Sequence, residues 1–467
     1  MHQMASANLG ASRRWTVLAI VVAAQFMFGV DAFIVNVAIP TIAAELHASP
    51  AQVESVIAIY LIAYASLIVT GGRLGDIYGT KPVFLTGVFG FTVTSLWCAL
   101  AQSGAELIAA RLAQGATAAL MVPQVLATLH LLFSDHLRSR AFAIYGVVLG
   151  LAGAAGFLLG GALVRFDIAG VGWRAVFLVN VPFGLVIIAA ASVIMPSVPR
   201  RAGTRLDVSG AIVLFTGLLC LIGPLLFGHD AHWAPWLWLV MTAGVVIIAA
   251  FLRLEHAVAS GGGMPLVDLA LLADKAFMRG LGAAFCFFFA NLSFYLIMTI
   301  FMQKALGIPP LDAGMVFVPL TLTFVFASRY AGVRAKHRGT LVLIEGCAIQ
   351  IAGLAALALT IAVKTPGAPM IALVLAIFGF GQGLVMAPLS SVVLSTVKPA
   401  AAGAGSGLYG TTAQVANAAG VAAIGAVFFA IEAHASSQIA MFAALAIFAT
   451  SIIACVALLS WMRRMPA

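Results

Sequence analysis

The charged side chains that lie most clearly within long apolar segments of the chain are Asp31, Arg111 and Glu345. A charge at the centre of a membrane helix costs about 2.5–3.5 kcal/mol on the insertion scale, so such residues are rare and usually functional or paired. Residues of these types can exchange a proton, form an ion pair or hold a charged ligand.

Asp31 and Arg111 lie at similar depths in their segments. Asp31 precedes Pro40, at the end of its segment, by about nine residues, and Arg111 follows the start of its own segment by about six. At a helical rise of about 1.5 Å per residue, both lie roughly 9–14 Å from the same surface, and they can face each other. We expect Asp31 to be either a structural ion-pair partner of Arg111 or a proton carrier or counter-charge for a cationic substrate. Arg111 then has either a structural or a coupling role.

Glu345 lies near the opposite end of its segment, in the other leaflet. Its side chain can reach the headgroups there, or it can contribute to a substrate pocket. Uncharged polar residues within the apolar segments have the same two interpretations, as hydrogen-bond partners between helices or as pocket residues. The pocket candidates, with Glu345, are Asn36, Tyr60, Gln124, Asn291 and Tyr295.

The composition excludes several classes of protein. Of 467 residues, 63% are hydrophobic and 8% are charged, and the mean hydropathy is +1.12. Soluble domains carry about 25% charged residues, so we exclude a soluble enzyme, a disordered chain and a nucleic-acid-binding protein. The five cysteines have no C-x-x-C or metal-site spacing, and no P-loop or H-E-x-x-H motif occurs. We expect no enzyme activity, no cofactor and no metal, and transport driven by an ion gradient.

Fourteen apolar segments are long enough to cross a bilayer, which needs about 20 residues. The sequence therefore predicts an all-α membrane protein with fourteen transmembrane helices. The expected spans are 15–39, 51–71, 83–101, 104–132, 141–164, 175–196, 208–228, 234–253, 278–302, 311–328, 340–362, 368–392, 405–430 and 438–461.

The basic residues indicate the orientation of the chain. If the N-terminus lies in the cytoplasm, 19 of the 24 Lys and Arg residues fall on that side. Arg111 lies within a span, and the exceptions on the outer side are Arg165, Arg174, Lys304 and Lys364. This asymmetry satisfies the positive-inside rule and explains the net charge of +9. We expect a multi-pass protein of the plasma membrane, the inner membrane of a bacterium, with both termini cytoplasmic.

Two linkers divide the chain. Segments 197–207 and 254–277 flank the seventh and eighth spans, which suggests two six-helix bundles with two extra helices between them. The expected units are 1–196, 197–277 and 278–467. In transporters with paired six-helix bundles, the substrate binds between the halves near the midplane. We expect a small-molecule substrate, protons and membrane lipids as partners, no nucleic acid, and function as a monomer.

Glycines recur on one face of the fifth span. Their spacing of three or four residues lets a neighbouring helix approach closely. This pattern indicates either helix packing alone or a pliable helix at the interface of two moving halves. The glycines are Gly146, Gly150, Gly153, Gly156 and Gly160, and Gly161 follows directly.

Four segments carry a resemblance to a known family. Residues 72–81 read G-R-L-G-D-I-Y-G-T-K, similar to a loop pattern G-x-L-x-D-x-x-G followed by two basic residues. Residues 31–40 read D-A-F-I-V-N-V-A-I-P, and 111–115 read R-L-A-Q-G. Residues 156–161 read G-F-L-L-G-G, similar to G-P-x-x-G-G. The chain resembles the major facilitator superfamily, and within it the fourteen-span drug:proton antiporters.

The resemblance implies an exporter of amphipathic small molecules that exchanges them for protons by alternating access. It implies that Asp31 and Arg111 take part in proton coupling, and that the inner-loop motif latches one state. The residues of this gate motif are Gly72, Asp76, Gly79 and Lys81. The chain departs from the family patterns at Phe33, where Thr is usual, at Thr80, where a basic residue is usual, and at Phe157, where Pro is usual. The alternatives are a dedicated metabolite transporter that need not be proton-coupled, and a membrane scaffold or sensor that transports nothing.

Overall fold

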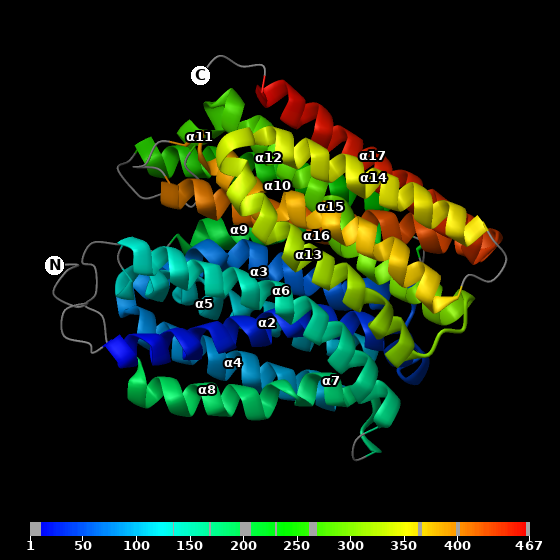
Figure 1. The fold of residues 1–467 in the computed structure, drawn as a ribbon, viewed down its shortest axis with the longest axis horizontal. Coiled ribbons are helices and arrows are strands. Elements are labelled where there is room, and N and C mark those ends of the chain that lie inside the picture. Colours follow the sequence, from blue (N-terminus) through cyan, green and yellow to red (C-terminus); the bar gives the residue numbers. More distant parts are fainter. Residues whose placement is uncertain are drawn as a thin grey trace.

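The structure is a computed structural model that describes residues 11–133, 135–167, 170–196, 207–228, 231–260, 269–362, 367–397 and 402–463. Within these ranges all regular secondary structure is helical, and fourteen helical segments are long and apolar enough to cross a membrane. The predicted fold class, an all-α protein with fourteen spans, is confirmed. Figure 1 shows the helices running side by side along the long axis of the molecule.

The helices of the first six spans are α2 (Ala11–Glu45), α3 (Pro50–Tyr78), α4 (Thr80–Leu100), α5 (Gly104–Leu132), α6 (Asp135–Phe166) and a broken sixth made of η2 (Gly172–Arg174), α7 (Ala175–Leu178) and α8 (Asn180–Ile194). The others are α9 (Val208–Phe227), α10 (Pro235–Ser260), the short α11 (Leu269–Ala273), α12 (Lys275–Ile300) with the π-helix η3 (Phe301–Ala305), α13 (Pro310–Arg338), α14 (Thr340–Ala362), α15 (Ala368–Leu394), α16 (Ala402–His434) and α17 (Ser437–Arg463).

The structure refines two predicted boundaries. The sixth span, predicted at 175–196, lies over Gly172–Ile194, and its helix is interrupted at Val179, between the end of α7 at Leu178 and the start of α8 at Asn180. Pro182 has no N–H to donate to the carbonyl of Leu178, so the regular hydrogen-bond ladder cannot continue through this point. The linker predicted at 254–277 is shorter, because α10 continues to Ser260. Residues 261–268 and most of the other linker, 197–206, lie outside the described residues.

The helices pack as two groups that meet along two seams. Helices α2 to α8 pack mainly on one another, and so do α12 to α17. Figure 1 shows the first group below and the second above, with the chain beginning and ending at the same end of the molecule. The seams are formed by α6 against α13 and by α3 against α16.

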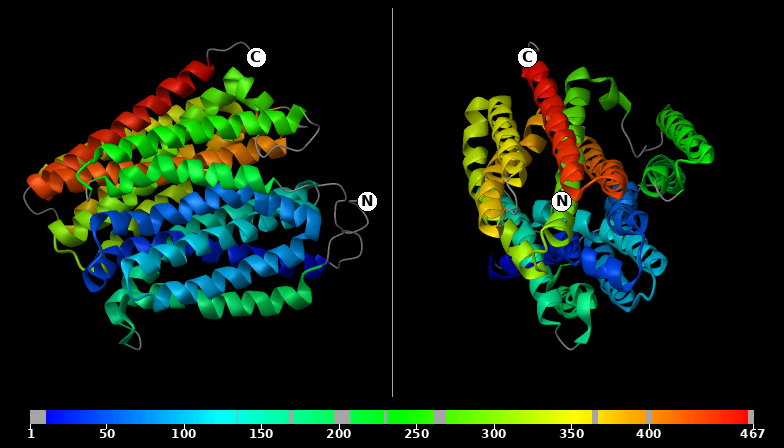
Figure 2. Two further views of the ribbon diagram at one scale, coloured as in Figure 1. Left: turned by 180° about the vertical axis from the view of Figure 1, so that it is seen from behind. Right: turned by 90° about the vertical axis from the view of Figure 1, so that its right-hand side faces the viewer.

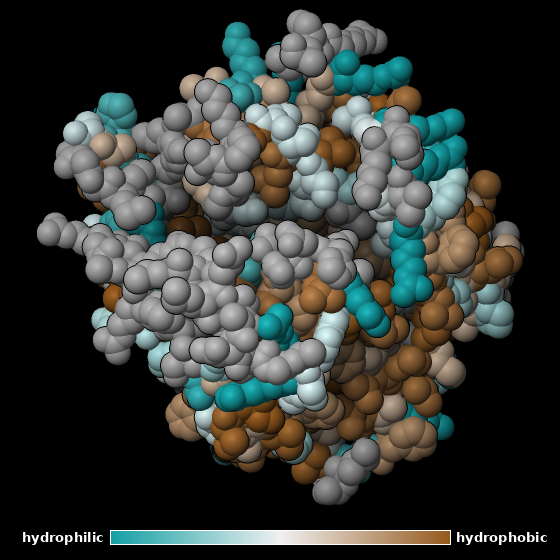
Figure 3. All heavy atoms as spheres, turned by 60° about the vertical axis from the view of Figure 1, so that its left-hand side comes forward, coloured by the Kyte–Doolittle hydropathy of each residue, from teal (hydrophilic) through white to brown (hydrophobic). Residues whose placement is uncertain are grey.

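The extra helices α9 and α10 pack on each other at the side of the molecule, where Figure 2 shows them set apart in the right-hand view. Helix α9 contacts α3 and α16, one helix from each group, so the pair covers one of the two seams. In Figure 3 apolar residues cover much of the flank, and hydrophilic side chains gather towards the end that carries the termini. This distribution is the one that a membrane-spanning bundle requires.

The two groups are in direct contact at the end away from the termini. Gln303 Nε2 donates a hydrogen bond to the carbonyl oxygen of Val37 across the groups, at 2.9 Å. A Cβ added to Gly161 of α6 would lie 2.8 Å from the Cα of Leu311 in α13. Further along α6, towards the other end, a Cβ added to Gly146 would meet no atom within 4 Å. The structure is therefore closed at the end away from the termini.

Candidate functional site

Asp31 and Arg111 form a buried ion pair. Asp31 lies on α2 and Arg111 on α5, and Arg111 Nη1 lies 2.7 Å from Asp31 Oδ2. The side chains are 0% and 1% exposed, so neither charge is stabilised by bulk water. A buried pair has to recover a desolvation penalty of several kcal/mol per ion, and it does so only when further hydrogen bonds satisfy both groups.

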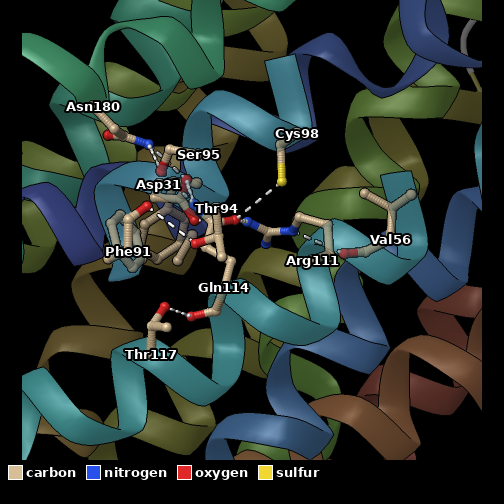
Figure 4. Close-up of polar contacts among 12 residues, drawn as sticks. Asp31, Val56, Phe91, Thr94, Ser95, Cys98, Arg111, Gln114, Thr117 and Asn180 are labelled. Atoms are coloured by element: carbon tan, nitrogen blue, oxygen red, sulfur yellow. Dashed lines mark hydrogen bonds and ion pairs between the residues drawn. The ribbon is translucent and has the colours of Figure 1, made fainter. Parts of the chain in front are cut away.

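Further donors satisfy the other oxygen of the Asp31 carboxylate (Figure 4). Asp31 Oδ1 accepts hydrogen bonds from Gln114 Nε2 at 3.0 Å and from Asn180 Nδ2 at 2.9 Å. Ser95 Oγ accepts from the same two amides, at 2.8 and 3.4 Å. Asn180 reaches this point because α8 begins at the break in the sixth span. The carboxylate thus connects helices α2, α5 and α8.

The Arg111 guanidinium is held by acceptors and by an aromatic ring. Its Nε donates to the carbonyl oxygen of Val56 at 3.1 Å, and its Nη1 also donates to Gln114 Oε1 at 2.6 Å. Its central carbon lies 4.0 Å from the ring centroid of Tyr60, close enough for a cation–π interaction. Tyr60, predicted as a pocket residue, is therefore part of the Asp31 network, which extends to α3.

The remaining pocket candidates fall into separate places. Asn36 is buried and donates to the carbonyl oxygen of Ala32, one turn earlier in its own helix. Gln124 donates to the carbonyl oxygen of Gly71 at 2.8 Å and fixes α5 to α3. Glu345 is 41% exposed and pairs with Arg338 at 2.7 Å. Among the described residues, Glu345 therefore lies apart from the buried pocket candidates.

Asn291 and Tyr295 are joined in the second group of helices. Tyr295 Oη donates to Gln382 Oε1 at 2.8 Å, and Gln382 Nε2 donates to Asn291 Oδ1. Tyr295 and Asn291 lie on α12, and Gln382 lies on α15. This hydrogen-bonded set is separate from the Asp31 network, because it lies on α12 and α15 and the Asp31 network lies on helices of the first group.

The gate motif forms the turn between α3 and α4. Gly79 has a φ of +96°, which favours glycine, and its N–H donates to the carbonyl oxygen of Gly75. Lys81 Nζ donates to the carbonyl oxygen of Ser192 at the end of α8, at 2.8 Å. Gly72 faces Pro123 of α5, and Asp76 is exposed beside Arg73.

The glycines of α6 make two different contacts. Added Cβ atoms at Gly156 and Gly160 would lie 2.8 Å from Phe33 Cβ and 2.7 Å from the carbonyl oxygen of Ile34, so these glycines let α2 approach. Gly153 faces the Phe33 ring, and Gly161 faces α13 of the other group. The surroundings of Gly150 lie outside the described side chains.

Comparison with known proteins identifies the family. A family profile described as "Major Facilitator Superfamily" matches residues 21–421. The chain belongs to the major facilitator superfamily. It is therefore a multi-pass membrane transporter. Members of this superfamily are transporters rather than enzymes.

Relatives in this superfamily include proteins named for antibiotic export. The chain is 33% identical to a "Probable actinorhodin transporter" of Streptomyces coelicolor, covering 90% of this chain and 73% of that protein. It is 32% identical to a "Tetracenomycin C resistance and export protein" of Streptomyces glaucescens, covering 91% and 77%. The crystal structure of the human organic anion transporter MFSD10 shares the fold, with a TM-score of 0.61, 17% identity, and coverage of 95% and 99%.

Sequence reasoning missed several buried polar groups, among them Asn180, Ser95 and Glu54. Asn180 and Ser95 complete the Asp31 network, but they are ordinary polar residues in sequence. Glu54 is a carboxyl 2% exposed on α3, beside Gly425 of α16. It lies within the predicted span 51–71, so a count of acidic residues inside spans would have found it.

Proposed function

We propose that this protein is a proton-coupled antiporter that exports amphipathic small molecules by alternating access. The observation that carries the proposal is the Asp31–Arg111 pair, a carboxylate buried at 0% exposure inside the membrane-spanning bundle. Such residues mark proton and ion pathways in membrane proteins. The names of the relatives support export of drugs or antibiotics as the direction of transport.

A proton that binds Asp31 changes the balance of the whole network. It removes the negative charge that faces Arg111 and places an O–H donor where carboxylate oxygens accepted from Arg111, Gln114 and Asn180. The Arg111 side chain must then rearrange, and it is also bonded to Val56 of α3. Protonation is therefore coupled to the relative positions of α2, α3, α5 and α8. In this scheme Asp31 exchanges its proton as Arg111 transmits the change to helix movement.

A proton suits Asp31 better than a cationic substrate does. Its two oxygens already accept from Arg111, Gln114 and Asn180, so a bound cation would have to displace a buried guanidinium. The proton gradient supplies about 2.3 kcal/mol per charge per 100 mV, enough for more than a tenfold gradient of a neutral solute. We place the protein in the plasma membrane with cytoplasmic termini, acting as a monomer. The closed end then faces outward.

The alternative is a dedicated metabolite transporter of the same fold. Phe157 favours it, because this residue stands where proton antiporters of similar pattern have proline. Such a carrier would take one compound and need not respond to a pH gradient.

Uptake into inverted vesicles tests the proposal. Several chemically unrelated labelled compounds are offered with and without an imposed pH gradient, to the wild type, Asp31→Asn and Glu345→Gln. We expect gradient-driven uptake of several compounds by the wild type, its loss in Asp31→Asn, and its retention in Glu345→Gln, where an exposed acid becomes an amide. Wild-type uptake by Asp31→Asn would refute the coupling role. Uptake of a single compound without pH dependence would establish the metabolite carrier.

A further inference from the structure

Four aromatic rings from four helices meet at the seam between the two groups. Phe33 of α2 and Phe157 of α6 come from the first group, and Tyr295 of α12 and Phe317 of α13 from the second. Phe157 stacks on Phe317 with ring centroids 4.2 Å apart and planes inclined by 22°. Tyr295 contacts the other three rings at 5.3 to 5.6 Å between centroids, edge-on to Phe33 and tilted against Phe157 and Phe317. Phe157 and Phe317 are 1% and 0% exposed, so the cluster is closed in this structure.

Phe33 and Phe157 belong together although they are far apart in sequence. Their ring centroids lie 5.4 Å apart, and each stands at a position where the chain departs from a pattern that it resembles. Gly153 and Gly156 of α6 leave the space that the Phe33 side chain occupies. The two departures therefore form one feature, a wall of rings on the first group that faces the second.

The cluster lies next to the proposed proton site. Phe33 follows Asp31 by two residues, so at about 100° per residue their side chains point to roughly opposite sides of α2. Asp31 faces α5 and α8, and Phe33 faces α6 and the seam. A shift of α2 that follows a change at Asp31 would move Phe33 against the other rings.

The cluster also has a polar margin. Tyr295 Oη donates to Gln382, which donates to Asn291, so hydrogen-bonding groups adjoin an otherwise apolar set of rings. Binding sites for small molecules commonly combine apolar walls with a few polar groups that fix orientation. Hydroxyl or carbonyl substituents on a ligand could exchange hydrogen bonds with this margin.

We infer that these four residues form an aromatic gate that binds planar aromatic substrates. The Phe157–Phe317 stack joins the two groups and must open when they separate at this end. When the stack opens, the faces of the Phe157 and Phe317 rings are uncovered. A flat conjugated ring system can lie against both faces, whereas a puckered molecule cannot contact both. The inference rests on the proposed export function and names its substrate class, planar polycyclic aromatics with hydroxyl or carbonyl substituents.

Equilibrium binding to the purified full chain tests the gate without any pH gradient. The probes are a fluorescent hydroxyanthraquinone and a radiolabelled saturated steroid alcohol of similar hydrophobicity, which is not planar. For Phe157→Leu we expect the Kd of the anthraquinone to rise about fivefold, which corresponds to about 1 kcal/mol, and that of the steroid to change less than about twofold. Phe157→Tyr keeps a ring face and should restore the preference.

The second group offers a matched control. Phe294 and Phe378 stack at 4.3 Å and 21°, nearly the geometry of the gate, but within one group. Phe378→Leu should leave the ratio of the two Kd values unchanged, and Phe33→Leu replaces Phe157→Leu if the latter does not fold. The inference is overturned if the wild type binds both probes equally, or if the leucine variants weaken both equally. Because binding needs no gradient, a failure of proton coupling in vesicles would leave this result intact.

Discussion

Replacing Asp31 with Asn should destabilise the protein as well as stop coupled transport. The two carboxylate oxygens accept from Arg111 on one side and from Gln114 and Asn180 on the other. An amide has only one oxygen, so whichever way it is turned, its NH₂ group faces another donor. The Arg111 charge also loses its buried partner.

The expected loss follows from the burial of this pair. Removing one partner of a fully buried ion pair costs about 3–5 kcal/mol, because an uncompensated charge remains. Replacing both partners with neutral residues leaves no such charge, so Asp31→Asn with Arg111→Gln should recover at least about 2 kcal/mol of that loss. Stability and coupling then separate, since the double variant regains stability but lacks the group that carries the proton.

Thermal unfolding in detergent at one scan rate and uptake in vesicles measure the two properties. Arg174→Gln is the control, because Arg174 pairs with Glu45 at 27% and 45% exposure and such pairs contribute about 0.2–1 kcal/mol. A double variant as unstable as Asp31→Asn would refute the reasoning on buried charge. A double variant that still exports along a pH gradient would refute the coupling role of Asp31.

Three further outcomes follow from the packing and charge of other residues. Gly161→Ala should shift the protein away from the closed state, because its methyl group would lie 2.8 Å from the backbone of α13. Gly146→Ala on the same helix is the control, since its methyl group would meet nothing within 4 Å. Cysteine labelling at the closed end measures the shift. Gly425→Ala places a methyl group 2.5 Å from the Glu54 carboxyl carbon and should lower the melting temperature by the equivalent of about 1 kcal/mol, and Glu54→Ser should restore it. For Asp207, burial acts to raise the pKa, but hydrogen bonds from the backbone and side chains beside it lower the pKa below its ordinary 3.8. The stability gained over Asp207→Asn should therefore be constant above about pH 5 and fall below about pH 4, and a difference that grew on acidification would contradict this sign.

The sequence was sufficient for the fold because a bilayer leaves few solutions. Apolar segments of about 20 residues can only span it as helices, so fourteen spans could be counted directly. The depth of Asp31 and Arg111 allowed them to face each other, and the structure places them 2.7 Å apart. Their roles in transport remain a proposal.

The rest of the site depends on contacts that no spacing specifies. Asn180 donates to Asp31 from a helix 149 residues further along the chain, and no spacing in the sequence indicates which face of that span packs against α2. Phe33 and Phe157 look like two unrelated departures until the packing of α2 on α6 brings their rings together. Glu54 stands near the start of its predicted span, and only the packing of α3 on α16 shows that it is buried.

The position of α9 has a consequence for how solutes reach the protein from the bilayer. Helix α9 covers the α3–α16 seam, while the α6–α13 seam has no comparable helix pair in the described contacts. We therefore expect acyl chains to border the α6–α13 seam, and a hydrophobic solute dissolved in the leaflet to approach the interior laterally mainly from that side. The α9–α10 pair thus gives the two seams different lipid surroundings. Changes in bilayer composition should act mainly at the α6–α13 face.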